Sequence, residues 1–332
     1  MPSERSEDIT TTRIAVLLVD GFALLSYASV VEPLRAANTL AARGLYDISQ
    51  IPVMGSQARS SSGSVVRADA QLGETVDFDL VILIAGDEGL NLEQPNLLHW
   101  LRTMARRGAT MAGVSGGAII LARAGLMTDR AMTVHWEHWE AVRELFPALH
   151  ILPSLFVMDG NRATCAGGVA PLDMMHAFIE RDHGVSLARQ VSDWYLHTQV
   201  RLPADPQRSG LAERYRLSSK PMVLAVEAME KNIDQPLTLE EIAATCALGT
   251  RQLNRLFAQY LGQGTMAFYR SMRLERAASL LQQTALPITD VALATGFGDS
   301  AHFSKAFRAK YARSPREMRD NWRRRQGAVD QT

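Results

Sequence analysis

Residues 238–261, TLEEIAATCALGTRQLNRLFAQYL, carry the pattern of two short helices separated by a tight turn. Thr238 and Glu241 have the spacing of a capping box, in which two side chains accept backbone amides at a helix start. Ala247-Leu248-Gly249 supplies the turn, and Thr250 is expected to cap the second helix. In that helix an apolar stripe can pack while polar residues face outward. The stripe consists of Leu253, Leu256, Phe257 and Leu261.

The same pattern recurs about fifty residues later, in residues 288–311, ITDVALATGFGDSAHFSKAFRAKY. First-helix positions recur after 49 residues and second-helix positions after 50, so the second turn, Gly296-Phe297-Gly298-Asp299, is one residue longer. Asp299 or Ser300 is expected to cap the following helix. Two helix-turn-helix patterns in register are a much stronger signal than one. The matching pairs are Ile242 with Val291, Ala243 with Ala292, Leu253 with Phe303, Phe257 with Phe307 and Leu261 with Tyr311.

The segment between the two units, MAFYRSMRLERAASLLQQT at residues 266–284, keeps helical periodicity between Gly264 and Pro287. It is therefore expected to be a rigid helix that sets the spacing of the two units. A helix-turn-helix unit places its second helix in the major groove, and successive grooves lie about 34 Å apart on one face of the duplex. The pattern predicts a protein that binds double-stranded DNA through two recognition helices.

These residues resemble the AraC/XylS family of transcription regulators over about residues 220–322. The most specific stretch, residues 288–319, combines an Ala-x-x-x-Gly-Phe turn, an aromatic-rich second helix and a final Pro-x-x-Met-Arg. The resemblance implies that residues outside the apolar stripes contact DNA. In the first unit these are Arg251, Gln252, Asn254 and Arg255, and in the second Ser300, Ala301, His302, Lys305 and Arg308.

The two units differ in these residues. Arg can read guanine and Asn can read adenine, each contact giving about 1–3 kcal/mol of discrimination, so the first unit is better equipped to read bases. Ala301 is too short to hydrogen-bond, and a basic run in the second unit favours phosphate contacts, which weaken steeply with salt. The alternative for each residue is a solvated surface group or a phosphate contact. The basic run consists of Lys305, Arg308, Lys310 and Arg313.

The chain of 332 residues is 47% hydrophobic and 21% charged, which leaves room for two globular domains. Apolar runs such as residues 14–19 and 80–85 are short, and the N-terminal MPSERSEDITTT is polar, so neither an export signal nor a membrane segment is expected. Cys165 and Cys246 are far apart and outside any metal-binding pattern. No disulfide framework, metal or cofactor is predicted, and a cytoplasmic location is expected.

Net charge is zero over the whole chain but uneven along it. Residues 1–219 hold 19 Lys and Arg against 24 Asp and Glu, whereas residues 220–332 hold 16 against 11. A basic C-terminal third suits a polyanion such as DNA, although a solvated charged surface would show the same excess.

The first two thirds of the chain alternate strand and helix patterns, which predicts a doubly wound, flavodoxin-like α/β domain with a mostly parallel sheet, followed by an all-α domain. Strand patterns occupy residues 13–21, 46–53, a segment near Val65, 78–86, 109–114 and 162–168, and helix patterns 23–44, 94–108, 116–125 and 169–184. The expected organisation is a disordered tail at 1–12, the α/β domain at 13–198, a linker at 199–219, the DNA-binding domain at 220–325 and a tail at 326–332.

Residues 113–117, Gly-Val-Ser-Gly-Gly, lie where a strand passes into a helix and satisfy G-x-S-x-G, the nucleophile elbow of serine hydrolases. A hydrolase would also need a base and an acid. The nearest histidine, His135, follows Ser115 by only twenty residues, whereas the α/β-hydrolase order is Ser, then the acid, then a distant His. A hydrolase or amidase domain fused to a DNA-binding module is the alternative interpretation.

The predicted α/β domain, residues 13–198, resembles the PfpI-like branch of the class I glutamine amidotransferase-like superfamily. The resemblance rests on the elbow segment together with AVLLVDGFALL near the start and LVILIAGD in the middle. In catalytic members the elbow residue is Cys, activated partly by a carboxylate from the first helix. Alignment puts Ser115 at the elbow and Ser26 in the place of the acid. A serine without an adjacent base is a poor nucleophile, so the resemblance implies a pocket without the chemistry.

The fusion of such a domain to an AraC-type module is similar to the GlxA-like regulators, in which the first domain binds a small molecule. The segments GVSGGAIILARAG, MTVHWEH and VSDWYLHTQVR resemble those of regulators of arginine, carnitine and glycine betaine use. These three ligands each combine a carboxylate with a cationic nitrogen. The resemblance therefore implies a small nitrogenous metabolite as the effector.

The sequence contains groups for both ends of such a ligand. Ser115 with the amides of Gly116 and Gly117 can hold a carboxylate, and Trp136 with Glu137 can hold a cation. The expected ligand-binding set is Ser26, Ser115, Gly116, Gly117, His135, Trp136, Glu137 and Cys165, with Trp139, Trp194 and Tyr195 as further aromatic candidates. Trp139 and Trp194, at helical spacing, are more often core or dimer-interface residues, and His135 equally fits a packed core position. Cys165, in the strand leading to Gly167 and Gly168, is expected to pack, with an approach to the pocket as the alternative.

We predict a ligand-responsive transcription regulator without enzymatic activity. We expect it to act as an activator, to form a homodimer that places its DNA-binding domains on neighbouring or repeated half-sites, and to have RNA polymerase as a partner. An architectural DNA-binding protein without a ligand is a further alternative.

Overall fold

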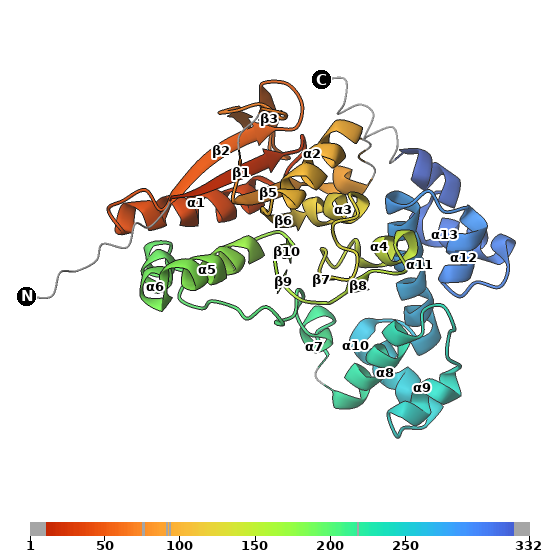
Figure 1. Ribbon diagram of the computed structural model, residues 1–332. Coiled ribbons are helices and arrows are strands. Elements are labelled where there is room, and N and C mark those ends of the chain that lie inside the picture. The colour runs from red at the N-terminus through yellow and green to blue at the C-terminus, as the bar shows by residue number, and fades with distance from the viewer. Residues whose placement is uncertain (1–10, 75–76, 91, 93, 218, 322–332) are drawn as a thin grey trace, which may run out of the picture. The chain divides into compact units, whose positions relative to one another are not determined.

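The computed structural model describes residues 11–74, 77–90, 92, 94–217 and 219–321 (Figure 1). The chain divides into two compact units after Gln207. The tails expected at residues 1–12 and 326–332 lie outside the described residues, apart from Thr11 and Thr12. Thr12 already begins the first strand.

The first unit is built on a six-stranded sheet in the order β2-β1-β5-β6-β10-β9. Neighbouring strands run parallel except for the edge pair β10–β9, which is antiparallel. The strands are β1 Thr12–Leu18, β2 Tyr46–Pro52, β5 Leu80–Ala85, β6 Thr110–Ser115, β9 Phe156–Asp159 and β10 Arg162–Cys165. Two small sheets accompany it, β3 Gln57–Arg59 with β4 Val65–Arg67 and β7 Ala131–Met132 with β8 His150–Ile151.

Helices cover both faces of the sheet. They are α1 Leu24–Leu40, the short 3-10 helix η1 Asp87–Leu90, α2 Pro95–Arg106, α3 Gly116–Arg123, α4 Trp139–Leu145, α5 Ala170–His183 and α6 Val185–Trp194. Along β1, Ile14 and Val16 belong to a core shared with α1 and α5, whereas Ala15 and Leu17 belong to a second core shared with α2 and α3. The predicted doubly wound fold is confirmed.

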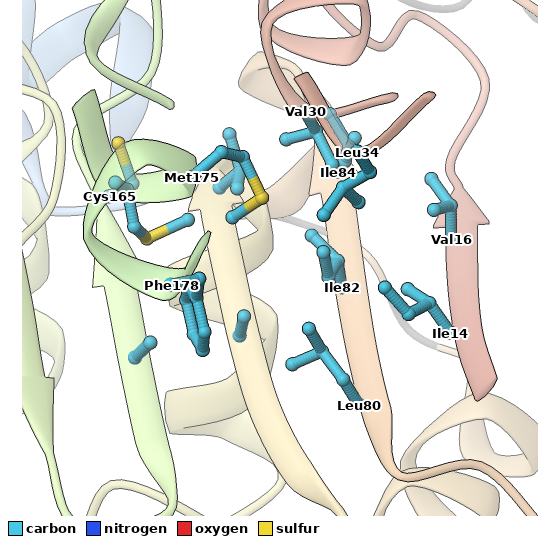
Figure 2. Packing of buried hydrophobic residues seen from close by; sticks show 14 of the residues in the cluster. Ile14, Val16, Val30, Leu34, Leu80, Ile82, Ile84, Cys165, Met175 and Phe178 are labelled. Carbon is cyan, nitrogen blue, oxygen red and sulfur yellow. The ribbon is translucent and has the colours of Figure 1, made fainter. Parts of the chain in front are cut away.

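Burial on both faces explains why the strand runs lack alternation. All six residues of β5, LVILIA, are buried. Figure 2 shows Ile82 and Ile84 of this strand on the face that also carries Met175 and Phe178 of α5. A strand covered by helices on both faces is expected to be apolar throughout.

The second unit is helical. Its elements are α7 Leu211–Arg214, α8 Lys220–Lys231, α9 Leu239–Thr245, α10 Thr250–Leu261, α11 Thr265–Gln283, α12 Ile288–Ala294 and α13 Ser300–Tyr311. The pairs α9–α10 and α12–α13 are the two predicted helix-turn-helix units. Within α11, Tyr269 is buried in the core of the first helix-turn-helix unit, and Leu281 is buried in the core of the second helix-turn-helix unit. This helix therefore belongs to both cores, as a rigid spacer should.

The helix starts agree with the sequence patterns except at Thr250. Thr238 and Glu241 form the expected capping box, and Asp299 caps α13 by accepting the amides of Ala301 and His302 at 3.0 and 3.1 Å. Thr250 was expected to cap α10, but the cap residue is Gly249, and Thr250 is already helical. The extended backbone of Gly249 ends the turn one residue earlier than the preference for a side-chain cap suggests.

Most of the expected linker, residues 199–219, is ordered on one unit or the other. Pro203 O accepts a hydrogen bond from Leu155 N at 2.9 Å, which attaches the first part to the α/β unit. Beyond Gln207, Arg214 in α7 forms an ion pair with Glu230 in α8 at 2.8 Å. The division between the units falls after Gln207, inside the segment that composition alone marked as linker.

Candidate nucleic-acid interface and ligand site

The recognition helix α10 packs through its apolar stripe. Leu253 and Phe257 are fully buried, whereas Arg251, Gln252 and Arg255 are exposed. The structure thus leaves three of the four residues that the resemblance assigns to DNA contact in this unit on the surface, where they can reach a groove.

Asn254 differs from its neighbours on α10. It is half-buried, and its Oδ1 accepts a hydrogen bond from the backbone amide of Thr265 at 3.0 Å. Thr265 is the first residue of α11, so this side chain connects the recognition helix to the spacer helix.

The second recognition helix, α13, exposes all five predicted DNA residues, namely Ser300, Ala301, His302, Lys305 and Arg308. Lys310, which we expected among the phosphate contacts, is placed differently. Its Nζ lies 2.6 Å from the Glu275 carboxylate and 2.9 Å from Ser271 O, so it ties α13 to α11. The exposed basic residues of this helix are therefore Lys305 and Arg308.

Sequence reasoning did not single out Arg273, which holds the second turn. Its Nε donates to Thr295 O at 2.8 Å, Nη2 donates to Gly296 O, and the guanidinium lies 4.3 Å from the centre of the Phe297 ring. These carbonyls end α12, where a helix leaves acceptors without partners. Arg273 thus fixes the second helix-turn-helix unit to the spacer helix.

In the α/β unit, Ser115 ends β6 at the carboxyl edge of the sheet, and the chain turns there into α3. Its φ of 55° and ψ of −125° are rare for a residue with a side chain. A Cβ added to Gly116 would lie 1.9 Å from Gly86 O, and one added to Gly117 would lie 2.0 Å from Leu83 O. The predicted strand-elbow-helix is present, and both glycines are required by the packing of α3.

Ser26 meets the same edge through the loop after β10. A Cβ added to Gly167 would lie 2.7 Å from Ser115 Cβ, so this loop passes directly beside the elbow. One residue further, Gly168 O accepts a hydrogen bond from Ser26 Oγ at 3.3 Å. Ser26 is fully buried in the first turn of α1. The structure therefore brings Ser26 and Ser115 to one loop.

The other predicted ligand residues follow β7. Trp136 is 38% exposed and Glu137 is exposed, with Glu137 Oε2 3.9 Å from Nδ1 of the half-buried His135. Indole and carboxylate groups on one exposed loop can accept a cationic group.

A buried histidine ties this loop to the elbow. His138 Nε2 lies 3.1 Å from Asp87 Oδ1, and this hydrogen bond holds the pKa of Asp87 below its usual value. Asp87 follows Gly86, whose carbonyl is packed against Gly116. Asp87 is therefore a further acidic group at the carboxyl edge, which the sequence patterns did not indicate.

Gln207 is a third residue that the sequence patterns did not indicate. Its Oε1 accepts from Trp136 N at 2.7 Å, and its Nε2 donates to Val134 O at 3.0 Å and Ser154 O at 2.7 Å. Gln207, the last residue of the α/β unit, thus supports the loop that carries Trp136.

Cys165 and the remaining aromatic candidates occupy other environments. Cys165 is fully buried in the core with Met175 and Phe178 (Figure 2), and burial raises the pKa of its thiol to about 12. Trp139 packs at the edge of the core on the other face. Trp194 is 52% exposed on α6, and Tyr195 Oη donates to Glu32.

Among the described residues, no side chain forms a hydrogen bond with Ser115 Oγ, and Ser26 Oγ donates to Gly168 O. A serine hydroxyl needs an adjacent base to act as a nucleophile at neutral pH. The described part of the chain also contains no cluster of His, Cys, Asp or Glu suited to a metal ion, and none of its helices is long and apolar enough to cross a membrane.

A surface hollow of about 750 Å³ lies at the opposite edge of the sheet, lined by Arg13, Asp79 and Arg107 among others. Its charges are already paired, with Arg13 3.7 Å from Asp79 and Arg107 2.8 Å from Asp77. The amino ends of parallel strands are not where ligands bind in open α/β sheets, so the elbow edge is the better candidate.

The α/β unit and the helical unit together define a class of protein, a helix-turn-helix DNA-binding regulator with an N-terminal α/β domain. Residues 12–181 match the model of the DJ-1/PfpI family and residues 242–321 that of a helix-turn-helix domain. The chain belongs to the AraC-type transcriptional regulators that carry a DJ-1/PfpI domain.

Named relatives match along nearly the whole chain. The HTH-type transcriptional regulator GlxA of Rhizobium meliloti is 45% identical over 95% of this chain and 97% of its own length. The HTH-type transcriptional regulator CdhR of Pseudomonas aeruginosa is 39% identical over 91% of this chain and 90% of its own. A crystal structure of an AraC family transcriptional regulator from Pseudomonas putida aligns with 55% of this chain and 99% of its own, at 24% identity and a TM-score of 0.51, and supports the fold.

Proposed function

We propose that the α/β unit senses a small nitrogenous metabolite with a carboxylate and a cationic nitrogen, and that this binding activates transcription. The observation that carries the proposal is the strained Ser115, kept at the carboxyl edge of the sheet without any catalytic partner in the described residues. Strain of this kind persists where the surrounding structure requires it and is frequent at ligand sites.

The two ends of the ligand have separate surroundings. The Ser115 hydroxyl and the first amides of α3 suit a carboxylate, because a helix start presents unpaired N–H groups and a partial positive charge. Trp136, Glu137 and Asp87 suit the cationic nitrogen through a ring face and carboxylates. Cys165 is too deeply buried to contact this ligand and serves in packing.

We expect calorimetric titration of the purified full-length protein with glycine betaine, carnitine and arginine to detect binding of at least one of them. Ser115→Ala should weaken that binding by roughly tenfold or more, because it removes a hydrogen bond to a charged group. Ser186→Ala is the matched control, since Ser186 lies beyond the far end of α5. Absence of binding by all three ligands would overturn this ligand class. Hydrolysis of ester or amide substrates that depends on Ser115 would instead establish the enzyme alternative.

We further infer that the regulator acts in the cytoplasm as a homodimer on neighbouring or repeated half-sites and contacts RNA polymerase. Two helix-turn-helix units on one spacer already present two recognition helices per chain, and a second chain would double this footprint. Sedimentation of the protein tests the homodimer, and footprinting with and without the effector tests the half-sites. A monomer protecting a single site would contradict both.

Arg255→Ala is expected to weaken binding to the preferred operator by about 10- to 100-fold and to relax the preference at one base pair. The reason is that an exposed Arg on a recognition helix can read guanine bidentately. Binding should be measured against a set of operators with single base-pair changes. Arg308→Ala is the matched control and should weaken all sequences equally while reducing the salt dependence. A uniform loss for Arg255→Ala would assign Arg255 to phosphate instead.

A further inference from the structure

In each helix-turn-helix unit a further helix follows the recognition helix. The starts of these two helices are capped in different ways. In the second unit Ser314 caps the helical residues 315–321 with its own side chain, since Glu317 N donates to Ser314 Oγ at 3.2 Å and Ser314 N to Glu317 Oε2 at 2.6 Å. In the first unit the cap position of α11 is Gly264, which has no side chain. The helix start therefore needs a partner from elsewhere.

Asn254 supplies that partner from the recognition helix. Its Oδ1 accepts the amide of Thr265, the first residue of α11, at 3.0 Å. The 50-residue offset between the units aligns Thr265 with Pro315, which has no amide hydrogen. It aligns Asn254 with Ser304. The first helix-turn-helix unit has the amide of Thr265 and an acceptor for it, Asn254 Oδ1. The second helix-turn-helix unit lacks that amide, and Ser314 caps its following helix.

We propose that Asn254 is a positioning residue, which fixes the recognition helix α10 to the spacer helix α11, and that it does not read a base. Bidentate reading of adenine needs the amide oxygen and nitrogen of Asn together, both directed at the base edge. Here the oxygen is committed to Thr265, and the side chain is half-buried. This replaces our expectation that Asn254 reads adenine.

The position matters because α11 belongs to both cores of the DNA-binding unit. Tyr269 packs in the first core and Leu281 in the second. A recognition helix that is loosely held to α11 is also loosely held relative to the second recognition helix. Two helices must enter successive grooves together, so loss of the Asn254 contact lowers affinity without altering which bases are preferred.

The test uses full-length protein and an operator selected by the wild-type protein from a pool of random duplexes. Asn254→Ala is expected to lower the melting temperature by a few degrees, as loss of a helix cap does, and to reduce affinity several-fold for every single-base variant of that operator alike. Gly264→Ser in the same chain should recover part of the melting temperature, because serine can cap α11 as Ser314 caps its helix. It should not recover the affinity, because this cap lies within α11 and does not hold α10. A Cβ at Gly264 meets only Asn254 Oδ1, at 3.6 Å, so the serine fits.

The control is Gly264→Ser alone, which should leave melting temperature and affinity close to the wild-type values. Two results overturn the proposal. The first is an Asn254→Ala protein whose preference changes at one base pair, since loss of a positioning contact should weaken binding to all sequences alike. The second is an Asn254→Ala protein with unchanged melting temperature and affinity.

Discussion

Gly117→Ala is expected to lower the free energy of unfolding of the DJ-1/PfpI unit by more than about 3 kcal/mol, which places it among the most damaging single substitutions in this chain. The added Cβ would lie 2.0 Å from Leu83 O and 2.8 Å from Leu83 C. Both are backbone atoms of β5, a strand paired on both sides. Overpacking is usually relieved by side-chain shifts, but here the strand itself would have to move.

Urea unfolding followed by circular dichroism measures this effect in the full-length protein. Gly44→Ala is the matched control, because a Cβ at Gly44 meets nothing within 4 Å. If the Gly117→Ala protein unfolded at the same urea concentration as the wild-type protein, the result would show that α3 can shift away from β5. The expected result also bears on function. Close packing explains why residues 116 and 117 are glycines, so the two glycines are not in themselves evidence of a ligand site at the elbow.

Local patterns predicted most of the architecture because they depend on neighbours in sequence. The capping box at Thr238 and Glu241, the cap at Asp299 and the apolar run of β5 all appear in the structure as expected. The segment from residue 131 to 159 was not predicted. Its strands β7 and β8 have two residues each, and hydrogen bonds with distant side chains hold it, such as the one that Thr133 N donates to Thr164 Oγ1 at 2.8 Å.

The candidate sites were predicted less completely, for a physical reason. Periodicity distinguishes the buried stripe of a recognition helix from its polar positions, but it does not show what a polar side chain meets. Asn254 and Lys310 lie off the stripe like Arg255, yet both are bonded to α11. Asp87 and Gln207 support the loop around Trp136 from segments far away in sequence. Such contacts depend on tertiary packing.

A buried aspartate anchors the segment that leads out of the DJ-1/PfpI unit. Asp173, in the first turn of α5, is fully buried and accepts hydrogen bonds from Arg201 N at 2.9 Å, Arg201 Nη2 at 2.6 Å and His197 Nε2 at 2.8 Å. Residues 197–201 are therefore held against α5, shortly before the chain enters the DNA-binding unit after Gln207.

Asp173→Ala is expected to lower the free energy of unfolding of this unit by about 2–4 kcal/mol. Breaking a buried ion pair typically costs about 3–5 kcal/mol, and the value is reduced here because Arg201 can still reach water. The Arg201 side chain is 36% exposed. Asp182→Ala on the same helix is the matched control, since its pair with Arg181 lies nearer the surface and should contribute less than about 1 kcal/mol.

Limited digestion with trypsin distinguishes a local anchor from a general loss of stability. Trypsin cleaves after arginine, and in the wild-type protein the Arg201 guanidinium is held by Asp173. Under native conditions Asp173→Ala should therefore be cleaved after Arg201 faster than the wild-type protein and the Asp182→Ala control. Unchanged cleavage after Arg201, with a lowered free energy of unfolding, would show that other contacts of this segment, such as Pro203 O with Leu155 N, hold it without the aspartate.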